Sequence, residues 1–180
     1  MLTRGVGRLI GKPGQSSTPV GRLLNEHANA CVGAVLERCS VATAAHPVRI
    51  RSEAVVEAFP SAFLGVMLRD PAGVHATRGD RSDTFYRHLS REGALSTLVE
   101  HLLPGRTPAM SLHDVTDHDE RAAVVCGLTA LCVAAGKFIA VGDEDGWIIL
   151  PPVGFTQPWA RSILERNAGS EQTSALYVSG

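Results

Sequence analysis

The sequence lacks the long apolar run that a membrane-spanning helix requires. Its longest apolar stretch, residues 122–135, falls short of the roughly 20 residues that cross a bilayer. A secretory signal is also missing, because Gly and Pro interrupt the residues that follow Arg4 and Arg8 and leave no apolar core. We therefore expect a cytoplasmic protein that has no membrane partner.

Closely spaced cysteines and an excess of positive charge are absent too. The chain of 180 residues has four cysteines but no C-x-x-C pair, so they are not spaced for a zinc or redox site. The net charge of −1 excludes a strongly basic nucleic-acid coat protein, and any contact with nucleic acid must be local. Hydrophobic residues at 44% and charged residues at 19% indicate one cored domain. We read the cysteines as reduced packing residues: Cys31, Cys39, Cys126 and Cys132.

Composition divides the chain into three parts. Residues 1–21 are basic, rich in Gly and Pro and free of acidic residues, which predicts a flexible N-terminal segment. Residues 22–166 carry the helix and strand patterns of a single domain. Residues 167–180 are mostly small and polar, so we expect this tail to fray.

Apolar residues that recur every three or four positions predict the helices of the domain. Pro60 suits the first turn of a short apolar helix, and Asp83 or the residue before it can cap another. Thr116 with Asp119 resembles a capping box ahead of a helix that we expect to be buried nearly all round and to end at Gly136. The predicted helices span residues 22–38, 60–68, 82–91, 92–103 and 120–135, with an amphiphilic segment at 158–166.

Runs of β-branched and aromatic residues predict the strands. Residues 48–50 and 54–59 form two such runs, and a proline stops the second because it has no N–H to donate to a sheet. Glu57 is therefore expected at the C-terminal end of a strand. Residues 142–146 form a turn ahead of Trp147–Leu150, a short buried strand. Because strands and helices alternate, the predicted fold class is α/β.

Acidic residues gather at the start of the helix predicted over 120–135. Asp117, Asp119 and Glu120 lie there beside His118, while Glu57 ends a strand elsewhere in the chain. Carboxylates from a strand end and a helix start can meet at one sheet edge and bind Mg²⁺ or Mn²⁺, which prefer oxygen ligands. Two such ions can position an attack on a phosphodiester. The same acids also suit helix capping and the helix dipole, and this alternative stays open.

A group of arginines is a second candidate contact for phosphates. Arg78, Arg81 and Arg87 lie in or beside a loop and could touch the backbone of a nucleic acid. Acidic residues such as Asp70 and Asp83 are interleaved with them, which favours a solvated surface over nucleic-acid binding.

The order of these segments resembles the domain of unknown function 429 family. They read VVEAFPSAFL around Glu57, AAVVCGLTA at 122–130 and EDGWIILPP at 144–152. The family has, in the same order, a strand ending in acid–aromatic–Pro, an Ala-rich helix and a strand with Gly-Trp-Ile before Pro. The resemblance covers about residues 53–152.

The resemblance implies a ribonuclease H-like fold, a mixed sheet flanked by helices, and metal-dependent phosphodiester cleavage. By position, Glu57 matches the strand-end acid of the family and Asp119 matches an acid three residues ahead of its helix. Ala122 stands where the family's helix often begins with Asp, and residues 1–52 contain no Asp that could be the first catalytic acid of such a fold. Either the N-terminal strands of the fold are missing from this chain, or catalysis is degenerate.

Two functions follow from the resemblance. In the first, the chain is a nuclease-like enzyme that uses Glu57, Asp117 and Asp119 to bind Mg²⁺ or Mn²⁺, with His118 or Glu120 assisting a water, and cleaves nucleic acid. In the second, it is a catalytically degenerate ribonuclease H-like module that binds a partner or forms a homo-oligomer. A sheet without its first strands would have an open edge, and an open edge can pair with another chain.

Overall fold

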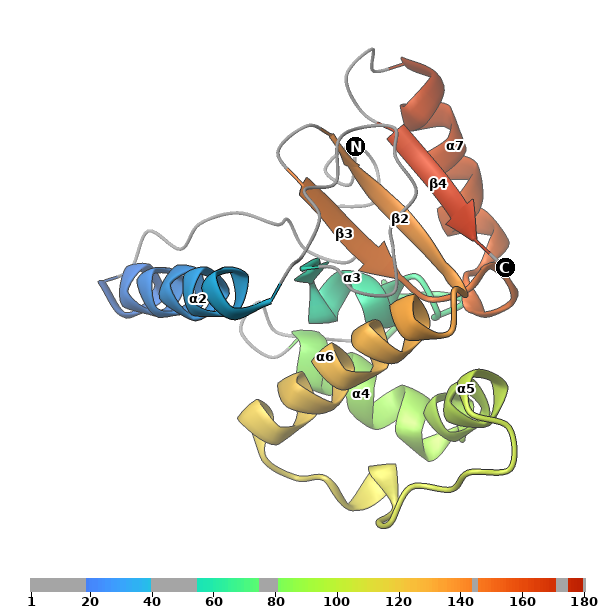
Figure 1. The fold of residues 1–180 in the computed structure, drawn as a ribbon. Coiled ribbons are helices and arrows are strands. Elements are labelled where there is room, and N and C mark those ends of the chain that lie inside the picture. Colours follow the sequence, from blue (N-terminus) through green and yellow to red (C-terminus); the bar gives the residue numbers. More distant parts are fainter. Residues whose placement is uncertain (1–18, 40–54, 75–80, 144–145, 171–174, 180) are drawn as a thin grey trace.

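The computed structural model describes residues 19–39, 55–74, 81–143, 146–170 and 175–179. Within these ranges the chain is an α/β protein in which one open, mixed sheet of four strands packs against helices (Figure 1). The strand predicted over 48–50 lies outside the described residues. None of the helices in the described ranges is both long and apolar enough to span a bilayer.

The sheet has the strand order β1–β3–β2–β4. Strand β2 (Phe138–Asp143) pairs antiparallel with both β3 (Gly146–Leu150) and β4 (Ala175–Ser179). The two-residue strand β1 (Glu57–Ala58) pairs with β3 in parallel. Glu57 therefore begins its strand, whereas the sequence predicts that it ends one.

Side chains of the strands alternate between two buried faces. From β2, Phe138 and Ala140 join one core, while Ile139 and Val141 join the other. A strand that is buried on both faces is a continuous apolar run, without the polar alternation that marks a half-exposed strand. The apolar run of β2 was not predicted as a strand, although the similar run at Trp147–Leu150 was, and its last two residues, Gly142 and Asp143, were expected to belong to a turn.

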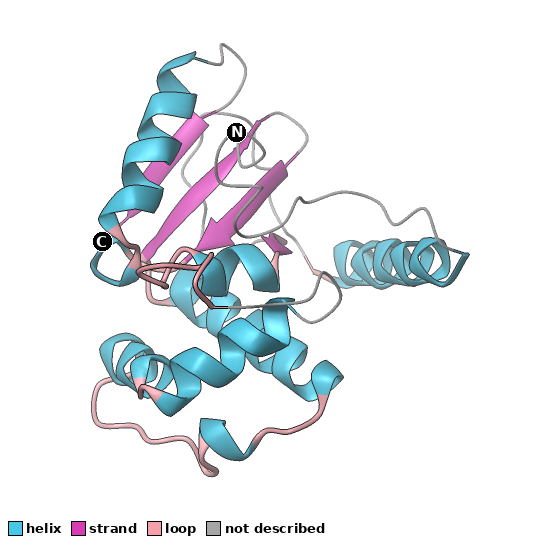
Figure 2. Cartoon of the chain, turned by 180° about the vertical axis from the view of Figure 1, so that it is seen from behind, coloured by secondary structure: helices cyan, strands magenta, loops and turns pink. Residues whose placement is uncertain are grey.

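Helices cover both faces of the sheet. The larger core lies between the sheet and four helices, and Tyr86, Leu95 and Leu128 are buried in it. On the other face, α7 (Pro158–Ser170) contributes Ala160 and Leu164 and lies beside β4 in the view from behind (Figure 2). The helices on the larger core are α3 (Pro60–Gly65), α4 (Arg81–Arg91), α5 (Ala94–Leu102) and α6 (His118–Ala134), with the 3-10 turn η1 (Leu112–Asp114).

The C-terminal residues differ from the tail that the sequence predicts. Helix α7 continues to Ser170, and Ala175–Ser179 form the edge strand β4. Leu176 packs on the α7 side and Tyr177 on the α6 side, so the strand is held by both cores. These tertiary contacts, which local composition does not reveal, order residues that were expected to fray.

Helix α6 begins and ends at specific backbone signals. Its N-cap is Asp117, not the predicted Thr116, and it stops before Gly136, whose φ of 66° is left-handed as predicted. The expectation that it is buried nearly all round is wrong, because one side, including Cys126 and Ala130, is exposed. Small residues on that side leave little apolar area in water, so their exposure costs little.

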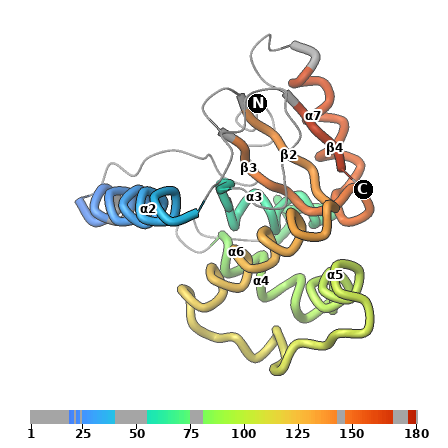
Figure 3. The backbone as a smooth tube through the Cα atoms, viewed as in Figure 1, coloured from blue at the N-terminus to red at the C-terminus, as the bar shows by residue number. Residues whose placement is uncertain are grey.

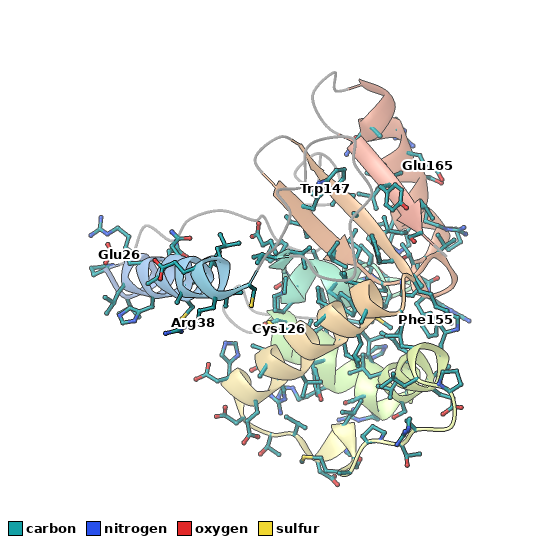
Figure 4. The ribbon with its side chains drawn as sticks, in the orientation of Figure 1. Glu26, Arg38, Cys126, Trp147, Phe155 and Glu165 are labelled. Atoms are coloured by element: carbon teal, nitrogen blue, oxygen red, sulfur yellow. The ribbon has the colours of Figure 1, made fainter. Side chains whose placement is uncertain are left out.

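Helix α2 (Pro19–Arg38) extends away from the rest of the described chain (Figures 1 and 3). Its charged residues Glu26 and Arg38 point into solvent (Figure 4). Cys31 and Cys39 are exposed as well, and together with the exposed Cys126 they correct the prediction that these cysteines are packing residues. Most of the exposed large hydrophobic side chains in the described ranges belong to this helix: Val20, Leu23, Val32, Val35 and Leu36.

Candidate functional site

The first turn of α6 is built around the carboxylate of Asp117. Its Oδ1 accepts hydrogen bonds from the backbone N–H of Asp119 at 2.9 Å and of Glu120 at 3.1 Å. The bond from Glu120 is the main cause that lowers the pKa of Asp117 below its ordinary value. Asp117 is therefore ionised over the neutral range and acts as the helix cap, the alternative that the sequence left open.

His118, the first residue of α6, is paired with a residue far away in the sequence. Its Nδ1 lies 3.1 Å from Oδ1 of Asp83 in α4, thirty-five residues earlier in the chain. The imidazole is 58% exposed, whereas the side chain of Asp83 is only 16% exposed. A mostly buried carboxylate thus holds one nitrogen of a ring that is more than half exposed.

Arg121 contacts the other oxygen of the Asp83 carboxylate. Its Nη1 lies 3.4 Å from Oδ2 of Asp83, and its Nε donates to the carbonyl oxygen of Val115 at 3.0 Å. The guanidinium carbon lies 5.9 Å from the ring centre of Tyr86, within the range of a cation–π contact. Since the arginine side chain is only 11% exposed, it is fixed in place by these three contacts.

Tyr86 completes what we call the Asp83 cluster, consisting of Asp83, Tyr86, His118 and Arg121. Its hydroxyl donates to the carbonyl oxygen of Leu112 at 2.9 Å, which ties α4 to η1. Burial raises the pKa of Tyr86, while the charge of Arg121 lowers it, and burial is the larger effect. Tyr86 therefore stays a neutral hydrogen-bond donor and serves as a structural wall of the cluster.

Beside the cluster lies a cavity of about 10 Å³, room for roughly one water molecule. Asp83, Tyr86, Arg121 and Ala122 are among its walls. A cavity this small cannot hold a nucleotide, so any substrate of His118 must bind outside it, at the surface. Ala122 is the position at which the resemblance expects an aspartate.

A larger hollow, about 810 Å³, lies between the loop after α3 and the end of α4. Arg69, Asp70, His88 and Glu92 line it, and His88 pairs with Glu92 at 3.3 Å. Charges of both signs alternate around its rim, which favours no single class of ligand. It contains none of the site residues that the sequence predicts.

The predicted metal ligands are not brought together. Glu57 is exposed at the start of β1, and Asp119 and Glu120 are exposed on α6. Among the residues that the structure describes, no three or more His, Cys, Asp or Glu side chains form a group that could hold a metal ion. One oxygen of Asp117 is already occupied by two backbone N–H groups. The donor set of Glu57, Asp117 and Asp119 therefore does not fit a bound Mg²⁺ or Mn²⁺ as it stands.

Sequence reasoning missed Asp83, Tyr86 and Arg121 as members of the site. Asp83 was considered only as a helix cap, because nothing local indicates a contact with His118. The helical spacing offered one signal, since His118 and Arg121 are three residues apart and share a face of α6.

An arginine of the predicted phosphate-contacting group lies next to the cluster. Arg87, one turn after Asp83 on α4, donates from Nε to the carbonyl oxygen of Asp83 at 3.3 Å and is otherwise exposed. Arg81 begins the same helix, and Arg78 lies outside the described residues. The α4 side of the Asp83 cluster thus carries positive charge at the surface.

No family model matches the chain, and neither the curated proteins nor the solved structures contain a match to it. The resemblance to the domain of unknown function 429 family stays a prediction.

Proposed function

We propose that the protein is a nuclease-like hydrolase that cleaves phosphodiester bonds of nucleic acid at the first turn of α6. The position of His118 carries this proposal. Asp83 holds its Nδ1 while the ring remains more than half exposed, which leaves Nε2 available to a substrate. Imidazole is the side chain best suited to accept and donate a proton near neutral pH.

The arrangement of the sheet adds support from the fold. The two segments that resemble family strands, at Glu57 and at Trp147–Leu150, pair in parallel as β1 and β3. Helices lie on both faces of that sheet. On these grounds we propose that the sheet and its helices are arranged as in a ribonuclease H-like fold.

Three residues in or near the first turn of α6 have separate roles under this proposal. His118 transfers the proton, and Arg87 offers a positive charge to a phosphate close to Asp83. Asp117 caps the helix and fixes the backbone that carries His118. Glu57, Asp119 and Glu120 remain predicted site residues, and no step of the proposed reaction passes through a metal ion.

A cleavage assay tests the proposal. The full chain is incubated with labelled RNA, single-stranded DNA and duplex DNA, in parallel with Mn²⁺ and with excess EDTA. We expect cleavage of at least one substrate, and a loss of about 100-fold or more in rate for His118→Ala. His113→Ala removes another exposed histidine nearby in the sequence and should retain the parent rate. Intact substrates under all conditions would refute the proposal.

Self-association through α2 is a second candidate function. Val35 lies on the side of this helix opposite Glu26, by the periodicity of an α-helix. Val20 lies toward the side of Val35, and both valines are exposed. Exposed apolar surface of this kind marks interaction sites, and an antiparallel second copy of α2 would cover it with matching apolar residues.

Light scattering of the full chain tests this second candidate. We expect a dimer for the parent and a monomer for the double variant Val20→Glu with Val35→Glu. Glu26→Ala changes the charged side of the same helix and should stay dimeric. A monomeric parent at high protein concentration would exclude self-association.

A further inference from the structure

We infer that the substrate class of this site is RNA, cleaved through its own 2′-hydroxyl group, and that Asp83 is the positioning residue of His118. The inference rests on the proposed function and deepens it. It is carried by the Asp83 cluster, in which one carboxylate bridges a surface imidazole and a mostly buried guanidinium.

Asp83 fixes the orientation of the His118 imidazole. Oδ1 of Asp83 lies 3.1 Å from Nδ1 of His118, and Oδ2 lies 3.4 Å from Nη1 of Arg121. A carboxylate that accepts the Nδ1–H bond leaves the lone pair on Nε2, the nitrogen that must act as a base. Because Arg121 is itself fixed by Val115 and Tyr86, the carboxylate cannot turn away from the histidine.

RNA supplies its own nucleophile. RNA carries a hydroxyl group next to every phosphate, and that group is both a donor and an acceptor of hydrogen bonds. A single well-placed base can activate it, whereas DNA needs an external water to be held and activated. The Asp83 cluster supplies an oriented base at an open surface, which suits the nucleophile that RNA provides.

The reaction balances without a further reactant. Nε2 of His118 takes the proton of the 2′-hydroxyl, O2′ forms a bond to phosphorus, and the bond from phosphorus to O5′ breaks. The leaving O5′ takes a proton from water, and the hydroxide that remains is neutralised by the proton that His118 gained. The products are a 2′,3′-cyclic phosphate and a 5′-hydroxyl, with no change of oxidation state.

Arg87 is the residue that we expect to contact the phosphate. Arg87 donates to the carbonyl oxygen of Asp83 through Nε and is exposed, so its charge lies within one helical turn of the carboxylate that orients His118. Contacts from arginine to phosphate position a nucleic acid without reading its sequence. We therefore expect cleavage with little base preference.

The test compares RNA with DNA of the same sequence in excess EDTA and analyses the product ends. The inference expects cleavage of RNA alone, leaving 2′,3′-cyclic phosphates. Cleavage of both polymers, or cleavage that requires Mn²⁺ and leaves 5′-phosphates, would overturn the inference and keep the proposed function. No cleavage of either polymer, with or without Mn²⁺, would overturn both.

Variants of Asp83 test its positioning role in the same assay. Asp83→Asn should lower kcat by about 100-fold to 10,000-fold with KM little changed, because the tautomer of His118 is no longer fixed. Asp83→Glu, which keeps the carboxylate, should recover part of the loss. The double variant that combines Asp83→Asn with His118→Ala should be no slower than His118→Ala alone.

A matched control lies at the end of the same helix. His88 lies on α4 and pairs at 3.3 Å with Glu92, the residue just after the helix, which makes an acid–histidine pair outside the site; Glu92→Gln should cleave at the parent rate. Circular dichroism shows whether each variant is folded. If Asp83→Asn does not fold, Asp83→Glu still tests the role of the carboxylate. Parent kcat for folded Asp83→Asn, or equal losses in Asp83→Glu and Asp83→Asn, would overturn the role assigned to Asp83.

Discussion

Trp159 donates its indole N–H to the carbonyl oxygen of Leu68 at 2.8 Å, across ninety-one residues of the chain. Two more bonds accompany it, because Gln157 donates its backbone N–H to Val66 and its side-chain amide to Met67. Three successive carbonyl groups after α3 are thereby satisfied by the residues at the start of α7. These polar contacts join the end of α3 to the start of α7, in addition to the apolar cluster that both helices share.

Replacement of Trp159 by Phe should therefore destabilise the fold. The carbonyl group of Leu68 would lose its partner in a part-buried setting, and we expect the free energy of unfolding to fall by about 1–2 kcal/mol. Urea denaturation followed by circular dichroism measures this change. Ser162→Ala, at an exposed position of α7, is the control and should unfold like the parent. An unchanged midpoint for Trp159→Phe would show that the bond contributes nothing.

The N-cap of α6 is Asp117 in the structure, whereas the sequence predicts Thr116. Asp117→Ala removes the acceptor of two backbone N–H groups and should lower Tm by about 2–4 °C, as expected for the loss of a helix cap in a domain of this length. Thr116→Ala should leave Tm unchanged, although the capping-box reading predicts the opposite. Thermal unfolding of both variants decides between the two residues.

The pH dependence of that cap follows from the direction of its pKa shift. The pKa of Asp117 is lower in the folded protein than its ordinary value of 3.8, with the bond from Glu120 as the first cause. Its contribution is complete above the unfolded pKa and is lost as the pH falls through the lower, folded pKa. The Tm difference between the parent and Asp117→Ala should be constant near neutral pH and shrink below pH 3.8. A difference that grows on acidification would contradict this assignment.

Loss of Arg121 should cost more stability than loss of an exposed arginine. The variant Arg121→Ala breaks contacts with Asp83 and Val115 and leaves the Asp83 carboxylate partly unpaired in a mostly buried site. We expect about 2–3 kcal/mol less stability in urea, the range for bonds that involve charged groups. Arg121→Lys should not restore it, because an ammonium group lacks the planar fork that reaches both partners. Arg91→Ala, in the exposed last turn of α4, serves as the control.

The cysteines give a chemical test of the fold. Cys132 is buried, which raises the pKa of its thiol to about 12, and burial also raises the pKa of Cys126. Cys31 and Cys39 are exposed on or just after α2. A thiol reagent at neutral pH should therefore modify Cys31 and Cys39 first and leave Cys132 unmodified until the protein unfolds. Mass spectrometry of timed samples shows the order, and early modification of Cys132 would contradict the described core.

Local signals account for the elements that were predicted correctly. Pro60 opens α3, Gly136 ends α6 in a left-handed conformation, and the apolar run Trp147–Leu150 forms β3. Each of these features depends on residues that are adjacent in the sequence. The strand β2 was missed, although it is buried on both faces like β3, because a short apolar run without alternation does not by itself distinguish a strand from another buried segment.

The candidate site was harder to predict, because its contacts join distant residues. His118 was singled out from the acidic turn, but its partner Asp83 comes from another helix, thirty-five residues away. Asp117 was expected to be a metal ligand or a helix cap, and both uses require the same carboxylate at the same place. The backbone hydrogen bonds from Asp119 and Glu120, which only the folded chain shows, assign it to the cap.

We propose that His118, oriented by Asp83, activates a ribose hydroxyl. A DNA strand that contains one ribonucleotide tests it most directly, because such a strand offers a single 2′-hydroxyl nucleophile. In excess EDTA, the parent protein is predicted to cut this strand only on the 3′ side of the ribonucleotide, and His118→Ala is predicted to leave it intact. An uncut strand, or cuts at the deoxynucleotides, would contradict the account.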